Sequence, residues 1–123
     1  MSKIKHQIVY WFPVYIYMLF ILYSSSQSVP LEPKFSKAFL PDYIKHIILF
    51  GILSILLYRA SSNSNFKSPY LFSILVTIIY GVFDESYQIF VPRRIPSLID
   101  VLSNSLGATL SQFIIFIIKK IKL

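Results

Sequence analysis

Side chains that could do chemistry gather in one stretch of this chain, residues 81–107, which lies between two long apolar runs. They are carboxylates, amides and guanidinium groups, namely Asp84, Glu85, Gln88, Arg93, Arg94, Asp100 and Asn104. An ionised side chain inside hydrocarbon costs several kcal/mol unless it is paired. We therefore interpret these residues as parts of one site. The competing interpretation is that they merely reach the water interface.

The carboxylates of this stretch, together with one histidine, are candidates for proton transfer. Asp84 and Gln88 are four residues apart and share a helix face, whereas Glu85 points about 100° away from Asp84. His46 comes from an earlier segment and can act as a general acid or base, or can simply be a satisfied interfacial histidine. The candidate catalytic residues are Asp84, Glu85 and His46, for hydrolysis or transfer at a phosphate or glycan bond. Whether the protein is an enzyme stays open.

Two adjacent arginines, Arg93 and Arg94, are candidates for binding an anion. Guanidinium groups bind phosphate or carboxylate through paired hydrogen bonds, and the start of a following helix adds a partial positive charge. The alternative is that the pair only contacts lipid headgroups at the membrane surface.

Polar residues on the last predicted helix complete the candidate binding set. Asp100, Asn104 and Gly107 follow one another at spacings of four and three, which places them on one stripe. Ser97 and Asp100 also match a capping box, so helix cap and site are equally good interpretations of Asp100. Asn104 lies a turn deeper and has no capping role. Gln88, Asp100 and Asn104 therefore join the arginines as candidate substrate-binding residues, and Gly107 can allow two helices to approach closely.

Composition limits the class of protein. The chain has 123 residues, of which 55% are hydrophobic and 14% charged, which is typical of a single membrane domain. Cysteine is absent, which excludes disulfides and thiolate chemistry, and the two histidines are too few for a histidine cage. We expect no metal and no cofactor. The formal charge of +7 belongs to loops and chain ends, and no basic face predicts a nucleic-acid partner.

The apolar runs predict an all-α integral membrane bundle of four transmembrane helices, forming a single domain over residues 1–123. The predicted spans are about 7–24, 43–60, 69–90 and 98–118. The first should bend near Pro13, and a signal peptide is its alternative interpretation, although no small-residue cleavage site follows it. Asp42 suits a cap for the second helix, and Ser68 with Pro69 suits the start of the third.

The connections and charges predict a topology. Residues 29–41 contain three prolines and should form a loop with a short turn around residues 35–40. Four spans place both termini on one side, and the positive-inside rule makes that side cytoplasmic. The basic residues on it are Lys3, Lys5, Arg59, Lys67, Lys119, Lys120 and Lys122. The polar helix ends, including the serine-rich residues 24–28 and Lys45, then converge at the outer leaflet.

The spaced polar pattern resembles the core signature of the VanZ-like family of small bacterial membrane proteins. The residues that carry the resemblance are Asp84, Glu85, Gln88, Phe90, Pro92, Arg94, Ser97, Asp100, Asn104 and Gly107. Lys45 and His46 with Phe50 are similar to an earlier element of the family, and the serine-rich residues to its polar segment. The resemblance spans residues 24–107. Arg93 stands where many members carry glycine, and here the lysine is adjacent to the histidine.

This resemblance implies a multi-pass protein of the bacterial plasma membrane, in a family whose namesake lowers susceptibility to teicoplanin-type glycopeptide antibiotics. The leading hypothesis is an envelope protein that engages a membrane lipid or an anionic, lipid-linked cell-wall precursor at the outer leaflet. The alternative is a non-enzymatic scaffold whose polar cluster locks the helices together. Transport fits less well, because the charges gather at one end rather than crossing the midplane. The oligomeric state stays open.

Overall fold

The computed structural model describes residues 1–27, 42–92 and 95–122, and these form helices and no strand. The elements in chain order are α1 (Lys3–His6), the π-helix η1 (Gln7–Trp11), α2 (Phe12–Ser25), α3 (Asp42–Ser62), α4 (Pro69–Tyr87), the 3₁₀-helix η2 (Gln88–Phe90) and α5 (Leu98–Lys122). The all-α prediction is confirmed for this part of the chain. The predicted loop at residues 29–41 lies outside the described residues.

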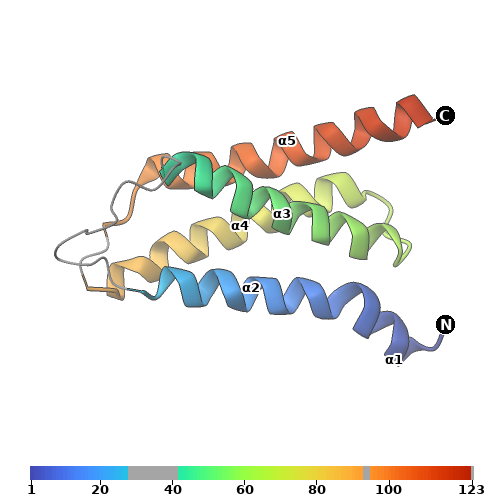
Figure 1. Ribbon diagram of the computed structural model, residues 1–123, viewed down its shortest axis with the longest axis horizontal. Helices are drawn as coiled ribbons and strands as arrows, with labels where there is room; N and C mark the ends of the chain where they lie inside the picture. Colours follow the sequence, from blue (N-terminus) through green and yellow to red (C-terminus); the bar gives the residue numbers. More distant parts are fainter. Residues whose placement is uncertain (28–41, 93–94, 123) are drawn as a thin grey trace.

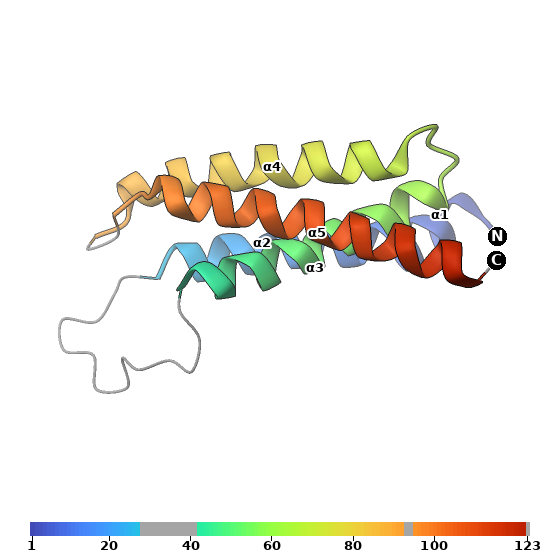
Figure 2. The same cartoon turned by 90° about the horizontal axis from the view of Figure 1, so that it is seen from above.

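The helices pack side by side into one elongated bundle (Figure 1). Both chain termini lie at the same end of it, together with the turn between α3 and α4 (Figures 1 and 2). The C-terminal end of α2, the start of α3, the end of α4 and the start of α5 lie at the opposite end. This arrangement brings together the polar helix ends that the sequence distributes over residues 24–104.

Among the described residues, three helical segments are long and apolar enough to cross a membrane. They are Lys3–Ser25, Asp42–Ser62 and Leu98–Lys122, with 23, 21 and 25 residues. The remaining long helix, α4, has 19 residues and carries Asp84 and Glu85 near its C-terminal end. These carboxylates lower the mean hydropathy of α4, so a fourth span stays a prediction.

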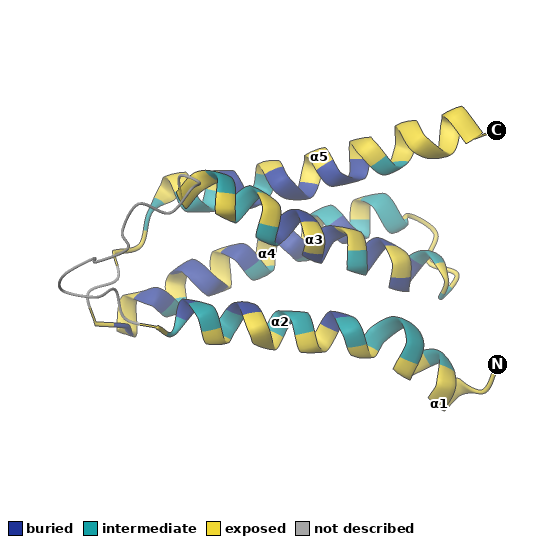
Figure 3. Cartoon of the chain, in the orientation of Figure 1, coloured by how far each residue is buried: buried dark blue, intermediate teal, exposed yellow. Residues whose placement is uncertain are grey.

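The bundle has a more apolar surface than a water-soluble protein, and its interior combines an apolar cluster around Phe50 with buried polar side chains. Many leucine, isoleucine and phenylalanine side chains of α2, α4 and α5 are exposed, and buried faces turn toward the interior (Figure 3). The buried polar residues among those described are Ser25, Ser54, Ser61, Ser73, Thr77, Asp84, Glu85, Gln88, Ser103, Asn104, Ser111 and Gln112. An apolar surface around small and polar interior side chains is typical of helices that face lipid.

The predicted irregularity near Pro13 appears as the π-helical turn of η1, which directly precedes α2. Pro13 has no N–H to offer the carbonyl four residues earlier, at Val9. The Arg59 guanidinium donates a hydrogen bond to that carbonyl oxygen at 2.7 Å, and it also lies over the Tyr10 ring. A charged residue of α3 thus satisfies the backbone group that proline leaves unpaired.

Helices α3 and α5 approach each other closely through small residues. A Cβ atom on Gly107 would overlap the Ile47 carbonyl oxygen, and a Cβ on Gly51 would lie 2.8 Å from Ser111 Oγ. Further along the same interface, Gln112 Nε2 donates to Ser54 Oγ at 2.7 Å. The stripe predicted from Gly107 is therefore the contact that fixes α5 against α3.

Helix boundaries differ from the prediction at two places near the polar end. Asp42 is the first residue of α3 rather than the cap before it. The third helix was expected to continue to residue 90, whereas α4 ends at Tyr87 and the tighter helix η2 continues to Phe90. Ser68 precedes α4 as predicted, with Pro69 in its first turn, but the serine side chain makes no capping hydrogen bond.

Candidate functional site

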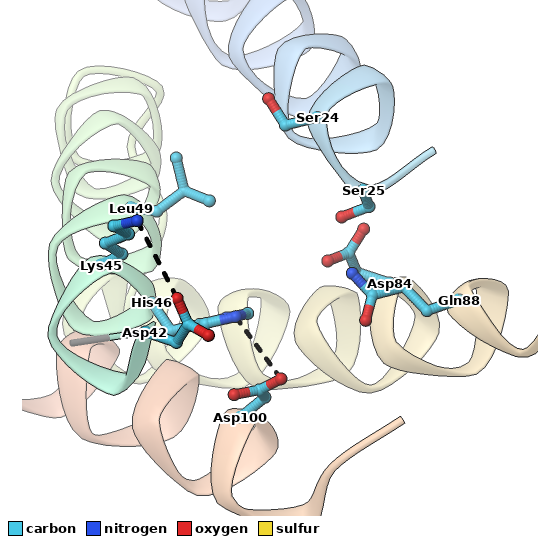
Figure 4. Close-up of a pocket in the computed structure, with 9 residues that line it drawn as sticks. All are labelled: Ser24, Ser25, Asp42, Lys45, His46, Leu49, Asp84, Gln88 and Asp100. Atoms are coloured by element: carbon cyan, nitrogen blue, oxygen red, sulfur yellow. Dashed lines mark ion pairs between the residues drawn. The ribbon is translucent and has the colours of Figure 1, made fainter. Parts of the chain in front are cut away.

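A cavity of about 260 Å³ opens at the end of the bundle opposite the chain termini. Its lining comes from α2, α3, α4, η2 and α5, and consists of Ser24, Ser25, Asp42, Lys45, His46, Leu49, Asp84, Gln88 and Asp100 (Figure 4). The predicted convergence of polar helix ends is therefore confirmed. The membrane side on which the cavity opens stays a prediction.

His46 connects two helices at the centre of this pocket. Its Nδ1 lies 2.8 Å from Asn104 Oδ1. Its Nε2 lies 3.6 Å from Asp100 Oδ2, and Figure 4 marks this second pair. An amide oxygen can only accept, so Nδ1 carries the hydrogen and Nε2 faces the carboxylate. The Phe50 ring lies parallel to the imidazole, with centroids 6.3 Å apart, and supports its orientation. At 3.6 Å, Nε2 and Asp100 attract each other as an ion pair when the imidazole is protonated, and Nε2 can exchange a proton with a ligand in the pocket.

The N-terminus of α5 explains why Asp100 is available to His46. Ser97 Oγ accepts a hydrogen bond from the N–H of Ile99 at 3.2 Å, so it caps α5 at the second helical residue, one residue before the Asp100 N–H that a capping box would use. In a capping box, the Asp100 side chain would accept a hydrogen bond from the backbone N–H of Ser97. Here that N–H donates instead to Glu85 Oε1, at 2.6 Å. Glu85 of α4 thus takes the place of the expected capping carboxylate, and the side chain of Asp100 turns toward the pocket.

Asp84 and Gln88 extend from α4 and η2 into the pocket from the side opposite His46 (Figure 4). They are 1% and 4% exposed. One turn before Asp84, the lack of a side chain at Gly81 leaves room for Asn104, because a Cβ there would lie 3.0 Å from Asn104 Nδ2. That Nδ2 atom is buried and has no hydrogen-bond partner within the part of the chain described. The amide is therefore held by His46 and by packing.

Lys45 marks the mouth of the pocket. Its ammonium lies 3.9 Å from Asp42 Oδ1, and the lysine and aspartate side chains are 49% and 89% exposed. An exposed pair at this distance contributes little stability, so Lys45 can turn to another anion. Asp42, Lys45, His46 and Leu49 follow at helical spacing on one face of α3. That spacing is the signal by which Asp42 and Leu49 could have been found from the sequence.

The predicted site residues fall into distinct groups. His46, Asp84, Gln88 and Asp100 line the pocket, and Asn104 lies directly behind His46. Glu85 lies outside the lining and holds the start of α5. Arg93 and Arg94 lie outside the described residues. Ser24 and Ser25, whose signal in the sequence was the weakest, also line the pocket.

The charges that line the described part of the pocket are mixed. Carboxylates are contributed by Asp42, Asp84 and Asp100, and nitrogen groups by Lys45 and His46. Within the described ranges, no three histidine or acidic side chains are placed to hold one metal ion together. The arrangement can donate hydrogen bonds to a small polar group of a ligand and accept hydrogen bonds from it. His46 can take up or release a proton at that group.

The fold and the pocket define a small helical membrane protein with a polar site at one end of its bundle. The chain belongs to the VanZ/LLP1 family, whose family model matches residues 5–119. The family resemblance seen in the sequence is thereby confirmed. Searches of curated proteins and of solved structures returned no match.

Proposed function

We propose that this protein crosses the bacterial plasma membrane several times and uses the pocket at the outer leaflet to engage the polar head of an anionic, lipid-linked molecule. A cell-wall precursor and a phospholipid both fit that description. The observation that carries the proposal is a cavity inside a bundle with an apolar surface, lined by ionisable groups from α3, α4 and α5 and by serines from α2. Ionisable residues kept in such a setting are functional candidates, because burying them is costly.

The size of the pocket narrows the ligand. A volume of about 260 Å³ is below the roughly 300–1,000 Å³ of pockets that enclose drug-sized ligands. A lipid headgroup fits this space, whereas a whole glycopeptide antibiotic does not. Any tolerance to teicoplanin would then act through the lipid-linked molecule rather than through capture of the drug.

Each polar group has a proposed role at this ligand. Arg93 and Arg94 follow Pro92 in the chain and would clamp the anion, which guanidinium groups do in a bidentate manner. Gln88 and Asn104 would orient it, Gln88 through its amide and Asn104 by holding His46. In a catalytic version, His46 paired with Asp100 would transfer a proton, with Asp84 on the other side of the pocket.

The test is teicoplanin susceptibility of a susceptible bacterial host that expresses the wild type, Asp100→Asn or Arg94→Lys. Ser86→Ala is the matched control, because Ser86 is exposed, lies near Asp84 on α4, and its hydroxyl bonds, among the described residues, to the Val82 carbonyl of its own helix. We expect protection by the wild type and the control, and its loss in both pocket variants at unchanged membrane level. A well-expressed wild type that gives no protection would exclude the resistance role and leave lipid binding to be measured directly.

A non-enzymatic scaffold is the second candidate, and the hydrogen bonds between helices favour it. His46 bonds to Asn104, Ser97 bonds to Glu85, and Gln112 bonds to Ser54. If the polar cluster serves only to lock the helices, Asn104→Ala should lower the folded yield. Asp100→Asn should then reduce function only as far as it reduces the stability of the protein. If the cluster is a site, Asp100→Asn should remove function while the folded yield persists.

A further inference from the structure

An apolar groove of about 350 Å³ runs between α2 and α3 beside the polar pocket. It is lined by Tyr17, Phe20, Lys45, Ile48, Leu49 and Ile52. Lys45 and Leu49 also line the polar pocket. The two cavities are therefore neighbours that share a wall, one polar and one apolar, and Figure 4 shows both shared residues at the pocket.

The groove is open toward the surroundings of the bundle. Phe20, Ile48 and Ile52 are 53%, 48% and 42% exposed, so their side chains form walls without a covering element among the described residues. The floor is held in place, because Tyr17 Oη donates a hydrogen bond of 2.7 Å to the Leu49 carbonyl oxygen. A hydrocarbon chain in this groove would bury apolar side chains without displacing either helix.

From this continuity we infer that the pocket and the groove together bind one phosphate-carrying lipid. Its phosphate lies at Lys45, its polar head extends into the pocket, and one hydrocarbon chain occupies the groove between α2 and α3. The inference rests on the proposed function and adds to it the place and path of the hydrocarbon chain. Two features select an amphipathic lipid over a second copy of the protein or a peptide: the groove leads directly into a polar pocket, and a basic residue stands at the junction.

The chain position can be tested with tryptophan fluorescence, because bromine atoms on a lipid chain quench a nearby indole. The Trp11→Phe background removes the one native tryptophan. Ile48→Trp then reports on the groove, and Ile79→Trp is the control on the exposed surface of α4. The two positions lie within about one helical turn of each other in depth, roughly 5 Å. Gly81 packs on Asn104, Asn104 bonds to His46, and Ile79 and Ile48 each lie two residues further from the pocket end than Gly81 and His46. Ile52→Trp with Leu75→Trp repeats the comparison if the first pair does not fold.

The full-length protein is placed in nanodiscs of phosphatidylcholine that contain a minor amount of phosphatidic acid. Two samples are compared: in one the bromine atoms are on the chains of phosphatidic acid, and in the other they are on the chains of phosphatidylcholine. We expect brominated phosphatidic acid to quench Ile48→Trp more than Ile79→Trp, and brominated phosphatidylcholine to show no such difference. Native mass spectrometry measures separately whether phosphatidic acid is retained over phosphatidylcholine. Lys45→Gln should weaken that retention about fivefold, the effect of one basic contact at a membrane surface.

The outcomes separate the two proposals. Selective retention of phosphatidic acid with equal quenching at both tryptophans would overturn the groove and leave the headgroup pocket standing. Absence of selective retention together with equal quenching would overturn the groove and the proposed binding of an anionic lipid. Selective retention with excess quenching at Ile48→Trp, together with retention that Lys45→Gln weakens, would support both.

Discussion

Glu85 and Asp84 are neighbours in the chain, yet their side chains have different surroundings. Asp84 lines the pocket, whereas Glu85 accepts the backbone N–H of Ser97 at 2.6 Å. The separation follows from the helical pitch, which turns successive residues by about 100°. One carboxylate is thereby placed for ligand contact, and the other joins α4 to the start of α5. The position of Asp100 in the pocket depends on Glu85.

At this scale we predict that Glu85→Ala destabilises the protein by about 1–3 kcal/mol, because the half-buried backbone N–H of Ser97 loses its carboxyl acceptor. Glu85→Gln should lose less, since its amide oxygen can still accept the bond. Unfolding in detergent micelles, followed by circular dichroism during titration with a denaturing detergent, measures the difference. Ser86→Ala, the exposed neighbour, should match the wild type. Equal stability of Glu85→Ala and Ser86→Ala would show that the Ser97 contact contributes nothing.

The interface of α3 with α5 determines how the helices are rotated, and hence which side chains enter the pocket. Gly107 lies against the Ile47 backbone, one residue after His46. Backbone at this position cannot move aside without separating the two helices. In contrast, Gly51 faces the Ser111 hydroxyl, a side chain that can rotate away. The two glycines of one interface therefore differ in how much volume they tolerate.

We predict that Gly107→Ala is more destabilising than Gly51→Ala. Overpacking typically costs about 1–3 kcal/mol, and Gly107→Ala should lie at the upper end because the overlap is with backbone. Both changes gain a similar 0.5–1 kcal/mol from helix propensity, so their difference isolates the overlap. The same detergent unfolding experiment measures it. Loss of the His46 to Asn104 contact should accompany Gly107→Ala, and equal stability of the two variants would contradict a backbone clash.

The molecule as a whole is divided into a basic end and a pocket end. The basic residues near the chain termini and the α3–α4 turn are Lys3, Lys5, Arg59, Lys67, Lys119, Lys120 and Lys122. The pocket lies at the opposite end. By the positive-inside rule, the basic end should face the cytoplasm and the pocket the outside.

Because the chain has no cysteine, this topology can be measured with single substitutions and no background. Ile95 lies at the pocket end and is 85% exposed, so Ile95→Cys places an accessible thiol there. A membrane-impermeant thiol reagent should label it in intact cells. Asn63→Cys, in the turn between α3 and α4, should react only after the membrane is permeabilised. The reverse pattern would place the pocket on the cytoplasmic side and exclude ligands confined to the outer leaflet.

The sequence by itself determined the helices and their polar ends. Within lipid, backbone groups must form their hydrogen bonds inside the segment itself, so apolar runs near spanning length predict helices. These predicted helices are the helices of the described structure. The same runs show which polar residues interrupt them. The order of the spans was therefore sufficient to predict a shared end of the bundle for the polar residues, and the longer spaced pattern from Asp84 to Gly107 indicated the family.

The tertiary structure decided the partner of each polar group. Glu85 caps α5, Asp100 is released to His46, and His46 bonds to Asn104, a residue 58 positions away. Local spacing made helix cap and site equally good interpretations of Asp100, because it could weigh only neighbours in the chain. Helix rotation, set where Gly107 meets the backbone of Ile47, is a property of two packed surfaces. Only that packing determines which carboxylate faces the pocket and which supports it.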